Sequence, residues 1–390
     1  MLKRLISVFL ILGILTAFFT GCTASRQEPT SVTTPPLETT LPEPATIETE
    51  AIAPSTEAPT EPATEPPATQ IPETEPEAPV TLPAFCLSEQ SVVLTEKGQI
   101  LDLYCGEVPP SEISWLSADE SIALFSQGKV VAINKGTTVV YAKYDGRIVF
   151  CEVICDVDPD AQRPYIPNEL LQAPRLAPPV VDMEDTTFFD DAAFIGDSVS
   201  YVLQQWHYLN GAFGNATFLT RSSMGLQNSI DGRIKISYQG SQYSPEDALA
   251  LVDVNKVFVM LGFNDVALWG IDGCLERWDI FLGRILEKCP DIQIYIQSCT
   301  PIHANGAYPG YDNDLFDDYN AALENYCQEK GYHFVNIAPY FKNYNNSMVT
   351  KYSSDKFVHI TYDGALVWER VLKAYGAEQL ALEAAEEGEK

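Results

Sequence analysis

The 390-residue sequence predicts an α/β domain with a parallel sheet wrapped by helices, preceded by a small all-β sandwich and a disordered stalk. In the C-terminal half of the sequence, strand-like runs alternate with helical patterns. Residues 85–156 contain several short apolar runs, as in an all-β domain. In residues 23–84, Pro, Thr and Glu dominate. We expect a signal segment 1–22, a stalk 23–84, an all-β domain 85–156, a linker 157–184, an α/β domain 185–380 and an acidic tail 381–390.

The N-terminus has the pattern of an export signal. Lys3 and Arg4 precede an apolar run over 5–19, which is too short for a comfortable membrane span. The run ends in "FFTGC", which resembles the lipobox of bacterial lipoproteins, and that resemblance implies a lipid on Cys22. We therefore expect a protein anchored in the cell membrane on its extracytoplasmic face. The alternative is a plain secretory signal with an incidental cysteine.

The stalk, residues 23–84, is rich in Pro, Thr and Glu, contains no aromatic residue and has Arg26 as its one basic residue. Such a segment cannot bury enough apolar surface to offset the entropy of ordering, so we expect it to be disordered and extended. Its acids contribute to a net charge of −30. A chain this acidic has no basic footprint for nucleic acid, so we expect no nucleic-acid partner.

The predicted all-β domain consists of short apolar pulses punctuated by Gly, Asp, Asn and Ser, at 100–104, 113–115, 122–125, 130–133, 139–142 and 148–153. The run "ISWLSADESIALFSQGKVVAINKGTTVVYAKYDG" resembles the bacterial immunoglobulin-like domains of group two. This resemblance implies a spacer or a weak adhesive module, with Trp115 in its core. The domain contains no catalytic constellation.

Cysteine spacing leaves the question of disulfides open. Four cysteines fall in each domain, and even counts outside the cytoplasm favour disulfides, whereas an anaerobic host would remove the pressure to form them. Cys151 and Cys155 cannot bond each other along a strand, because they would lie about 13 Å apart. Their partners, if any, would be Cys86 and Cys105. No cysteine or histidine pattern has zinc spacing, so we expect no metal and no cofactor.

From about residue 185, strands and helices alternate as in a parallel sheet covered by helices. Strands are predicted over 192–195, 216–220, 256–261, 292–297 and 333–337. Helices are predicted over 198–209, 275–288, 315–330 and 362–383. In such sheets functional groups gather beyond the carboxyl ends of the strands, so the residues that follow each strand are the candidates for chemistry.

Two of these strand ends carry polar residues of interest. Gly196-Asp197-Ser198 stands between the first strand and its helix, where Ser198 either caps the helix or serves as a nucleophile at the positive helix end. Asn264 follows a later strand in "GFND", where it is either a turn residue or a hydrogen-bond donor at the same sheet edge.

Four histidines are available as a base. His359 stands just before the last helix, with Asp355 four residues earlier, and is the preferred base. His303, after a strand end, is its one serious rival. His207 falls within a predicted helix and His333 at the start of a buried strand, so both are expected to be structural.

Four blocks in this order resemble the SGNH (GDSL) hydrolase family over residues 190–375: Gly196-Asp197-Ser198, Gly225 in "RSSMGLQN", Gly-x-Asn-Asp at 262–265 and the late acid with His359. The resemblance implies a flavodoxin-like sheet with Ser198 as nucleophile and His359 as base. It also implies an oxyanion hole formed by the N–H groups of Ser198 and Gly225 and the Asn264 side chain.

The third triad member departs from the family pattern, which has an acid three residues before the histidine. Lys356 occupies that position here, and the acid is Asp355. Residues four apart in an extended chain are about 13 Å apart, but in a helical turn about 6 Å. Asp355 therefore orients His359 only if residues 355–359 are coiled into a turn.

These residues predict a serine ester hydrolase, and we expect its substrate to be an O-acyl or O-acetyl ester of a carbohydrate or cell-wall glycan. Asp197, Trp269 and His303 are the expected substrate-binding residues, with aromatic residues in 303–318 lining the site. We expect a monomer. One alternative is an O-acyltransferase with the same triad, and another is a non-catalytic surface adhesin.

Overall fold

The structure, a computed structural model, describes residues 85–303 and 308–388. The predicted signal segment, its lipidation residue Cys22 and the predicted stalk lie outside the described residues. From Phe85 onward, the described residues belong to one compact unit. Within that unit an all-β segment comes first in the chain and an α/β segment follows.

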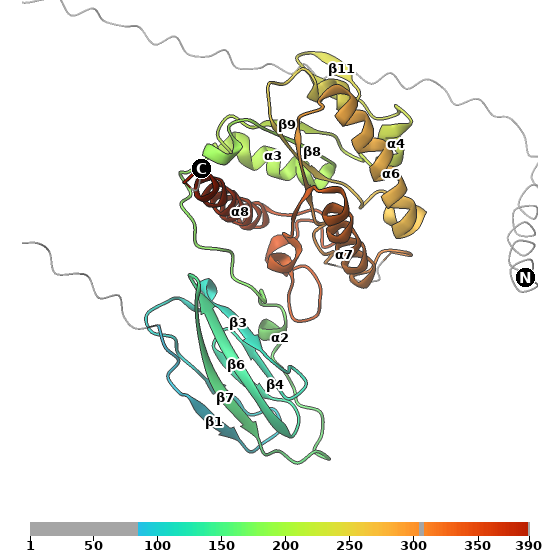
Figure 1. Cartoon of the computed structure of the whole chain (residues 1–390). Helices are drawn as coiled ribbons and strands as arrows, with labels where there is room; N and C mark the ends of the chain where they lie inside the picture. Colours follow the sequence, from blue (N-terminus) through green and yellow to red (C-terminus); the bar gives the residue numbers. More distant parts are fainter. Residues whose placement is uncertain (1–84, 304–307, 389–390) are drawn as a thin grey trace, which may run out of the picture. The chain divides into compact units, whose positions relative to one another are not determined.

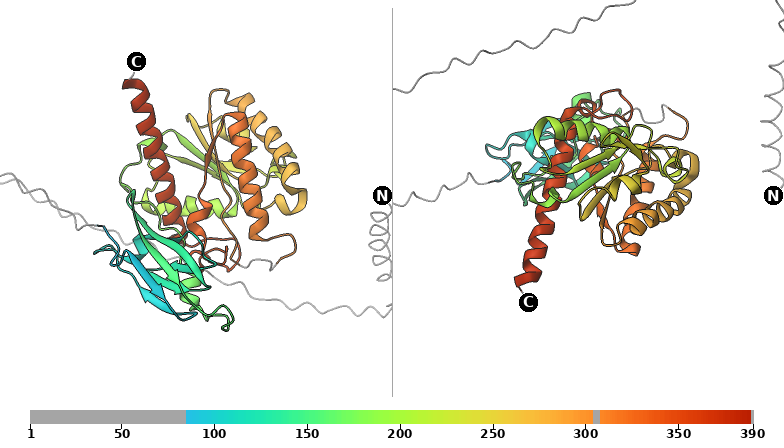
Figure 2. Two further views of the ribbon diagram at one scale, coloured as in Figure 1. Left: turned by 60° about the horizontal axis from the view of Figure 1, so that its bottom comes forward. Right: turned by 90° about the horizontal axis from the view of Figure 1, so that it is seen from above.

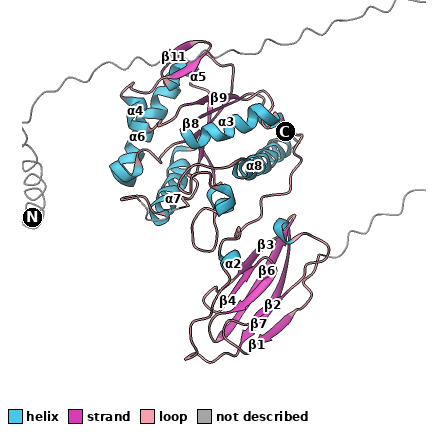
Figure 3. Cartoon of the chain, turned by 180° about the vertical axis from the view of Figure 1, so that it is seen from behind, coloured by secondary structure: helices cyan, strands magenta, loops and turns pink. Residues whose placement is uncertain are grey.

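Two sheets make up the all-β segment (Figure 3). One has the strand order β1-β7-β6-β3, with bounds Ser91–Leu94, Arg147–Cys155, Gly136–Tyr144 and Ser114–Ser117. The other has the order β2-β5-β4, with bounds Ile100–Asp102, Lys129–Ala132 and Ala123–Ser126. Trp115 is buried between them and packs edge-on against Phe125. The immunoglobulin-like assignment of this segment stays a prediction.

All eight described cysteines are free thiols in the structure. Cys151 and Cys155 are both buried on β7. Cys105 is also buried, and its backbone pairs with that of Leu87 in an isolated β-bridge. The disulfides that the sequence left open are therefore not present among the described residues.

Five parallel strands form the sheet of the α/β segment, in the order β14-β13-β12-β8-β9 (Figure 1). Their bounds are His333–Val335, Gln293–Gln297, Lys256–Met260, Ala192–Gly196 and Thr217–Thr220. Counted along the chain, this is the 2-1-3-4-5 order of flavodoxin-like sheets, which confirms the predicted α/β fold class. The strand order reverses between β8 and β12, and ligands bind beyond the strand ends at such a point.

Helices cover both faces of this sheet (Figure 1). α3 (Ser198–Asn210) packs against α8 (Tyr362–Gly388), whereas α6 (Val266–Lys288) packs against α4 (Leu226–Ile230), α5 (Pro245–Leu249) and α7 (Asn313–Lys330). The strands are buried on both faces, as expected for a parallel sheet between helical layers. The remaining short elements are α2 (Asn168–Leu171), β10 (Ile236–Tyr238), β11 (Ser241–Tyr243) and the 3₁₀ turns Pro110–Glu112, Thr187–Phe189, Ala338–Phe341 and Thr350–Tyr352.

The structure differs from the predicted elements at several helices. α6 starts at Val266, nine residues before the predicted start, and is interrupted by a kink at Gly270, whose φ of 67° and ψ of 176° are not helical. α4 and α5 were not predicted, since five residues are too few to show a helical period. α8 continues to Gly388 through an Ala- and Glu-rich run, and its last turns project from the sheet (Figure 2).

No helix in residues 85–303 and 308–388 is long and apolar enough to cross a membrane.

Candidate active site

Ser198 is the first residue of α3 and follows directly on the turn that leaves β8. Asp197 caps the helix, because its Oδ1 accepts the Val199 N–H at 2.9 Å. The Ser198 N–H is one of the first-turn donors that have no partner inside the helix. Both the helix dipole and this free donor favour negative charge next to the serine. The cap role that the sequence proposed for this tripeptide thus falls to Asp197.

Ser198, His359 and Asp355 form one chain of hydrogen bonds. The Oγ of Ser198 lies 3.0 Å from Nε2 of His359, although the two residues are 161 positions apart in sequence. On the other side of the ring, Nδ1 lies 2.6 Å from Oδ2 of Asp355. This is the geometry in which a base takes the serine proton while an acid orients the ring.

A tight turn brings Asp355 back onto His359. The second carboxylate oxygen, Oδ1, accepts the N–H groups of Phe357 at 2.8 Å and His359 at 3.2 Å. Lys356 has φ 57°, a left-handed conformation that reverses the chain between the acid and the base. Ser353 and Ile360 pair as a bridge that closes the loop. The turn that the Asp355 contact requires is therefore present, although it is not helical.

The hydrogen bonds of Asp355 keep its carboxyl charged. Burial would raise its pKa, but the bond to His359 and the N–H of Phe357 outweigh burial and leave the pKa below its ordinary value of 3.8. The carboxylate is thus ionised at neutral pH and can stabilise an imidazolium. The His359 side chain is 40% exposed, so the three groups are open to solvent at the edge of the sheet.

Asn264 follows β12, so it reaches the same sheet edge as Ser198 from the neighbouring strand. Its amide Nδ2 donates to Oδ2 of Asp197 at 3.2 Å and to the carbonyl of Met224 at 2.9 Å. Both amide hydrogens thus have partners within the protein. Asp197 and Met224 therefore set the direction of the Asn264 amide next to the serine turn.

Gly225 caps the N-terminus of α4, the helix that follows β9 along the chain. Its N–H donates to Oδ1 of Asn228 at 2.9 Å. The Asp265 carboxylate accepts the next two N–H groups, from Leu226 at 2.9 Å and Gln227 at 3.2 Å. A Cβ at position 225 would lie 2.7 Å from Oδ2 of Asp265, so a side chain does not fit there. Asp265 thereby holds this loop against the end of β12.

Asp197 does not have the role of a substrate contact that the sequence analysis gave it. The residue is only 1% exposed, and its oxygens bond the start of α3 and Asn264. Burial raises its pKa to about 7, against an ordinary value of 3.8, and the nearby Asp265 raises it further. A buried carboxylate with these partners fixes the first turn of α3 and the Asn264 amide in place.

The other two expected substrate-binding residues lie near the surface. His303 is tied through Nε2 to Thr350 at 3.1 Å and through its N–H to the carbonyl of Phe357 at 2.8 Å. His359, not His303, is the histidine that is bonded to Ser198. Trp269 is exposed on α6, and the guanidinium carbon of Arg277 lies over its ring, 4.0 Å from the ring centroid.

The aromatic segment predicted at 303–318 is described except for residues 304–307. Tyr308 is 54% exposed, and its ring centroid lies 4.3 Å from that of Phe357, two residues before His359. Tyr311 packs against Phe357 as well and donates its hydroxyl to the carbonyl of Phe263 at 2.8 Å. Aromatic side chains thus flank the His359 loop.

Sequence reasoning missed three residues that hold this site together: Asp265, Asn228 and Tyr311. Asp265 stands in the "GFND" run, and the sequence signal was visible but consistent with ordinary turn chemistry. Asn228 at the third helical position is a capping-box signal that could have been found. Nothing in the sequence pairs Tyr311 with Phe263, because that contact exists only after the sheet has formed.

Among the described residues, no group of three or more His, Cys, Asp or Glu side chains is arranged to hold a metal ion.

Residues 194–366 match the GDSL-like lipase/acylhydrolase family, a span that covers the serine turn, the Asn264 turn and the His359 loop. Residues 194–366 are therefore a GDSL-like lipase/acylhydrolase domain. Among curated proteins, none matches the chain.

Several solved structures are similar to the chain. One is a GDSL-like lipase from Bacteroides thetaiotaomicron VPI-5482, 16% identical, with 51% of this chain and 93% of the other covered and a TM-score of 0.37. A carbohydrate esterase family 3 protein from Talaromyces cellulolyticus is 12% identical, with 49% and 97% covered and a TM-score of 0.36. An acetylxylan esterase from Geobacillus stearothermophilus is 16% identical, with 46% and 91% covered and a TM-score of 0.33. Likenesses this distant carry no information about the substrate.

Proposed function

We propose that this protein is a serine ester hydrolase that acts outside the cytoplasm on O-acyl or O-acetyl esters, with a carbohydrate or cell-wall glycan as the alcohol. One observation carries the proposal: Ser198, His359 and Asp355 form an unbroken chain of hydrogen bonds at 3.0 and 2.6 Å. These three hydrogen-bonded residues lie at the strand ends where an α/β sheet of this order binds its ligands.

In the first half of the reaction, Oγ of Ser198 attacks the acyl carbon while Nε2 of His359 takes the hydroxyl proton. A tetrahedral intermediate forms, with its negative charge on the former carbonyl oxygen. The imidazolium then gives its proton to the departing alkoxide, the C–O bond to the alcohol breaks, and the acyl group remains on Ser198. Asp355 holds the proton on Nδ1 and stabilises the imidazolium.

The oxyanion is stabilised by the Ser198 N–H, the Gly225 N–H and the Asn264 amide. In the free enzyme the last two donors are engaged, Gly225 with Asn228 and Asn264 with Asp197 and Met224. The oxyanion shares these donors with their partners in the protein, and those partners fix the positions of the donor groups before substrate arrives. Donors that are already oriented need no reorganisation at the moment of reaction, and losing one typically costs about 10²–10³ in rate.

In the second half, water attacks the acyl-enzyme and His359 takes its proton. The second tetrahedral intermediate collapses, the acid leaves, and the proton returns from Nε2 to Oγ of Ser198. The open position of His359, whose side chain is 40% exposed, supports access of this water.

The choice of a carbohydrate ester rests on the aromatic residues around the His359 loop. Tyr308 is exposed and contacts Phe357, and Tyr311 packs against Phe357 as well. Aromatic faces present broad apolar surface with a polar edge, which matches the C–H face and hydroxyl rim of a sugar ring. A small acyl group on such a sugar fits an open site better than a long lipid chain.

Membrane anchoring completes the proposal. The "FFTGC" run at the end of the apolar signal segment supports lipidation of Cys22, and the segment 23–84 is the spacer between the bilayer and the enzyme. The stalk and the all-β segment would then present the hydrolase to a polymer outside the membrane.

The test is hydrolysis of a short-chain aryl ester and release of acetate from acetylated glycans. Ser198→Ala and His359→Ala are each expected to remove nearly all activity, and the double variant to lose little more, because the two groups act as a unit. His303→Ala is the matched control and is expected to keep most activity. Loss of activity in His303→Ala with activity retained in His359→Ala would show that the base is assigned wrongly.

A further inference from the structure

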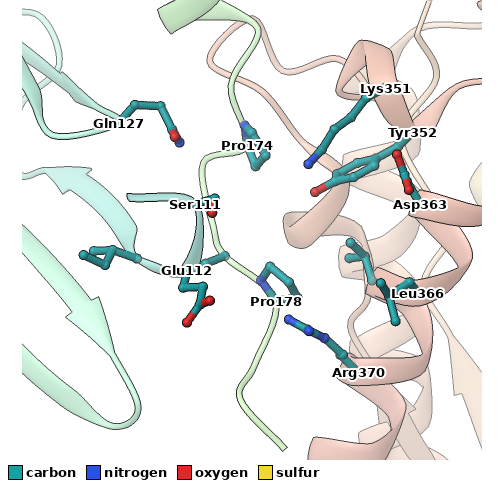
Figure 4. Close-up of a pocket in the computed structure, with 13 residues that line it drawn as sticks. Ser111, Glu112, Gln127, Pro174, Pro178, Lys351, Tyr352, Asp363, Leu366 and Arg370 are labelled. Atoms are coloured by element: carbon teal, nitrogen blue, oxygen red, sulfur yellow. The ribbon is translucent and has the colours of Figure 1, made fainter. Parts of the chain in front are cut away.

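A second polar cavity lies away from the hydrolytic triad (Figure 4). It has a volume of about 350 Å³, within the size range of small-ligand sites. Three parts of the chain form its walls: the turn before β3 in the all-β segment, linker residues such as Pro174 and Pro178, and the segment from Lys351 to Arg370. Neither Ser198 nor His359 lines it.

Four charged side chains line this cavity and none has a charged partner. They are Glu112, Lys351, Asp363 and Arg370, two acids and two bases. None forms an ion pair or a side-chain hydrogen bond with another described residue. In Figure 4 the ends of Lys351 and Arg370 point across the cavity toward Pro174 and Pro178. The cavity therefore carries unused donors and acceptors with no net charge.

Tyr352 adds a hydroxyl group that faces this cavity. The residue is 2% exposed, yet its hydroxyl makes no hydrogen bond to another described residue, and Figure 4 shows that hydroxyl directed into the cavity. Burial and, to a smaller extent, the charge of Asp363 raise the pKa of Tyr352 to about 12, although the charge of Arg370 lowers it. A hydroxyl that faces an open cavity is free to bond a ligand in place of water.

We propose that this cavity binds a sugar unit, separately from the triad. With two acids and two bases in its lining, the cavity has no net charge and therefore gives no overall attraction to a strongly charged ligand of either sign. Hydroxyl groups both donate and accept, so a neutral polyol satisfies carboxylates, cations and the Tyr352 hydroxyl together. The proline rings and the side chains of Leu366 and Val367 supply apolar surface for the C–H face of the ring.

The cavity and the triad share one segment of chain. Lys351 and Tyr352 stand immediately before the turn of Asp355, and Asp363 follows His359 by four residues. The Thr361 N–H donates to the carbonyl of Tyr352 at 2.8 Å, which holds the two arms of this segment together. A glycan chain held here would stay close to the hydrolase, which is useful for a polymer that carries many esters. The inference goes beyond the esterase proposal and does not depend on it.

Binding is measured by isothermal titration of the full chain carrying Ser198→Ala, so that no ester is turned over. The probes are xylohexaose, cellohexaose and chitohexaose at millimolar concentration. At least one is expected to bind, and Tyr352→Phe and Arg370→Met are each expected to weaken it by about tenfold, since a bond to a charged or buried group is worth about that factor. Tyr326→Phe and Arg284→Met, the same exchanges on α7 and α6, are the matched controls and should bind as before.

A stability measurement separates binding from folding. The Tyr352 hydroxyl has no partner in the free protein, so Tyr352→Phe is expected to unfold at the same urea concentration as the parent or at a higher one. Unchanged affinity in Tyr352→Phe or in Arg370→Met, or no binding of any of the three probes, overturns the sugar site.

The esterase proposal is tested separately, by wild-type hydrolysis of the aryl ester. Hydrolysis without sugar binding refutes the cavity alone, and sugar binding without hydrolysis refutes the esterase alone.

Discussion

At the scale of single residues, the two carboxylate oxygens of Asp355 make different contacts. Oδ1 accepts N–H groups that form the turn, while Oδ2 bonds Nδ1 of His359 at 2.6 Å. An asparagine keeps an oxygen for the turn but offers no negative charge to the imidazolium. In the proposed reaction Asp355 thus acts through His359 and is a positioning residue.

We expect Asp355→Asn to lower kcat on an aryl ester by at least about a hundredfold with little change in KM, because the imidazolium loses its counter-charge and the ring its tautomer. Lys356→Gly is the control, since glycine accepts φ 57° and the turn persists. Steady-state kinetics give kcat and KM of both variants, and urea unfolding gives their stability. Near-normal turnover in a stable Asp355→Asn enzyme would leave a Ser–His dyad.

Asp197 predicts a pH dependence of stability. Its folded pKa of about 7 lies above its ordinary value of 3.8, so between these values the folded chain holds a proton that the unfolded chain has released. The resulting stabilisation is fully present below about pH 4 and is lost as pH rises through about 7, a change on the order of 4 kcal/mol. Asp197→Asn removes this contribution.

The free energy of unfolding of the wild type, relative to Asp197→Asn, is therefore expected to fall between about pH 4 and about pH 8. Urea titrations across that range measure it. Asp253→Asn, the same exchange at an exposed loop residue, is the control and should follow the wild type. A constant difference between wild type and Asp197→Asn would mean that this carboxyl is not perturbed by burial.

At the scale of elements, the start of α4 is clamped to the end of β12 by one carboxylate. Asp265 accepts two N–H groups from the first turn of α4, and Gly225 leaves room for it. The loop that carries one predicted oxyanion donor is thereby tied to the strand that carries another, Asn264. A shift of about 1 Å in such a loop can reduce rate about 10²-fold.

Gly225→Ala tests this clamp. The new Cβ would lie 2.7 Å from the Asp265 carboxylate, so the loop or the acid must move. We expect a loss of about 1–3 kcal/mol in stability and at least about a tenfold drop in kcat. Gly283→Ala on α6, where a Cβ meets nothing within 4 Å, should instead stabilise the protein by up to about 1 kcal/mol. Equal behaviour of the two variants in kinetics and thermal melts would argue against the clamp.

At the scale of the whole molecule, the all-β segment contacts the α/β segment through residues outside the hydrogen-bonded triad. The Tyr344 hydroxyl donates to the carbonyls of Trp115, at 2.7 Å, and Phe125. Leu124 and Val131 form a small apolar cluster with Leu170 of the linker. No residue before Ser198 belongs to the hydrogen-bonded triad.

A chain shortened to begin at residue 184 is therefore expected to hydrolyse aryl esters with a kcat close to that of the full chain. It should melt at a lower temperature, because Tyr344 loses its buried acceptors. Kinetics well below the melting temperature separate the two effects. A large loss of kcat in the folded, shortened chain would show that the all-β segment shapes the active site.

Anchoring is tested at the same scale through Cys22. If the lipobox reading is right, Cys22→Ser leaves the precursor uncleaved or releases the protein to the medium. Fractionation of cells that express the wild type and the variant measures this. A Cys22→Ser protein that stays in the membrane fraction as a processed chain would refute the lipoprotein proposal.

Local patterns in the sequence were enough to predict the α/β class, the two strands that precede Ser198 and Asn264, and the helices α3 and α7 to within a few residues. Strand and helix periods repeat within a window of residues, and the residue after a parallel strand necessarily lies at one edge of the sheet. For the same reason the short helices α4 and α5 were missed, since five residues do not complete enough turns to show a period.

The tertiary structure alone decided how the side chains of the site meet. His359 reaches Ser198 across 161 residues, Asn264 finds Asp197, and Asp265 finds the turn at Gly225. The buried position of Asp197, which the sequence analysis assigned to substrate, follows from the packing of α3 on the sheet. Contacts between distant segments depend on how whole elements pack, and no local period encodes that. Even the contact between the nearby residues Asp355 and His359 depends on the left-handed conformation of Lys356. Lysine rarely adopts this conformation, and the surrounding sequence does not indicate it.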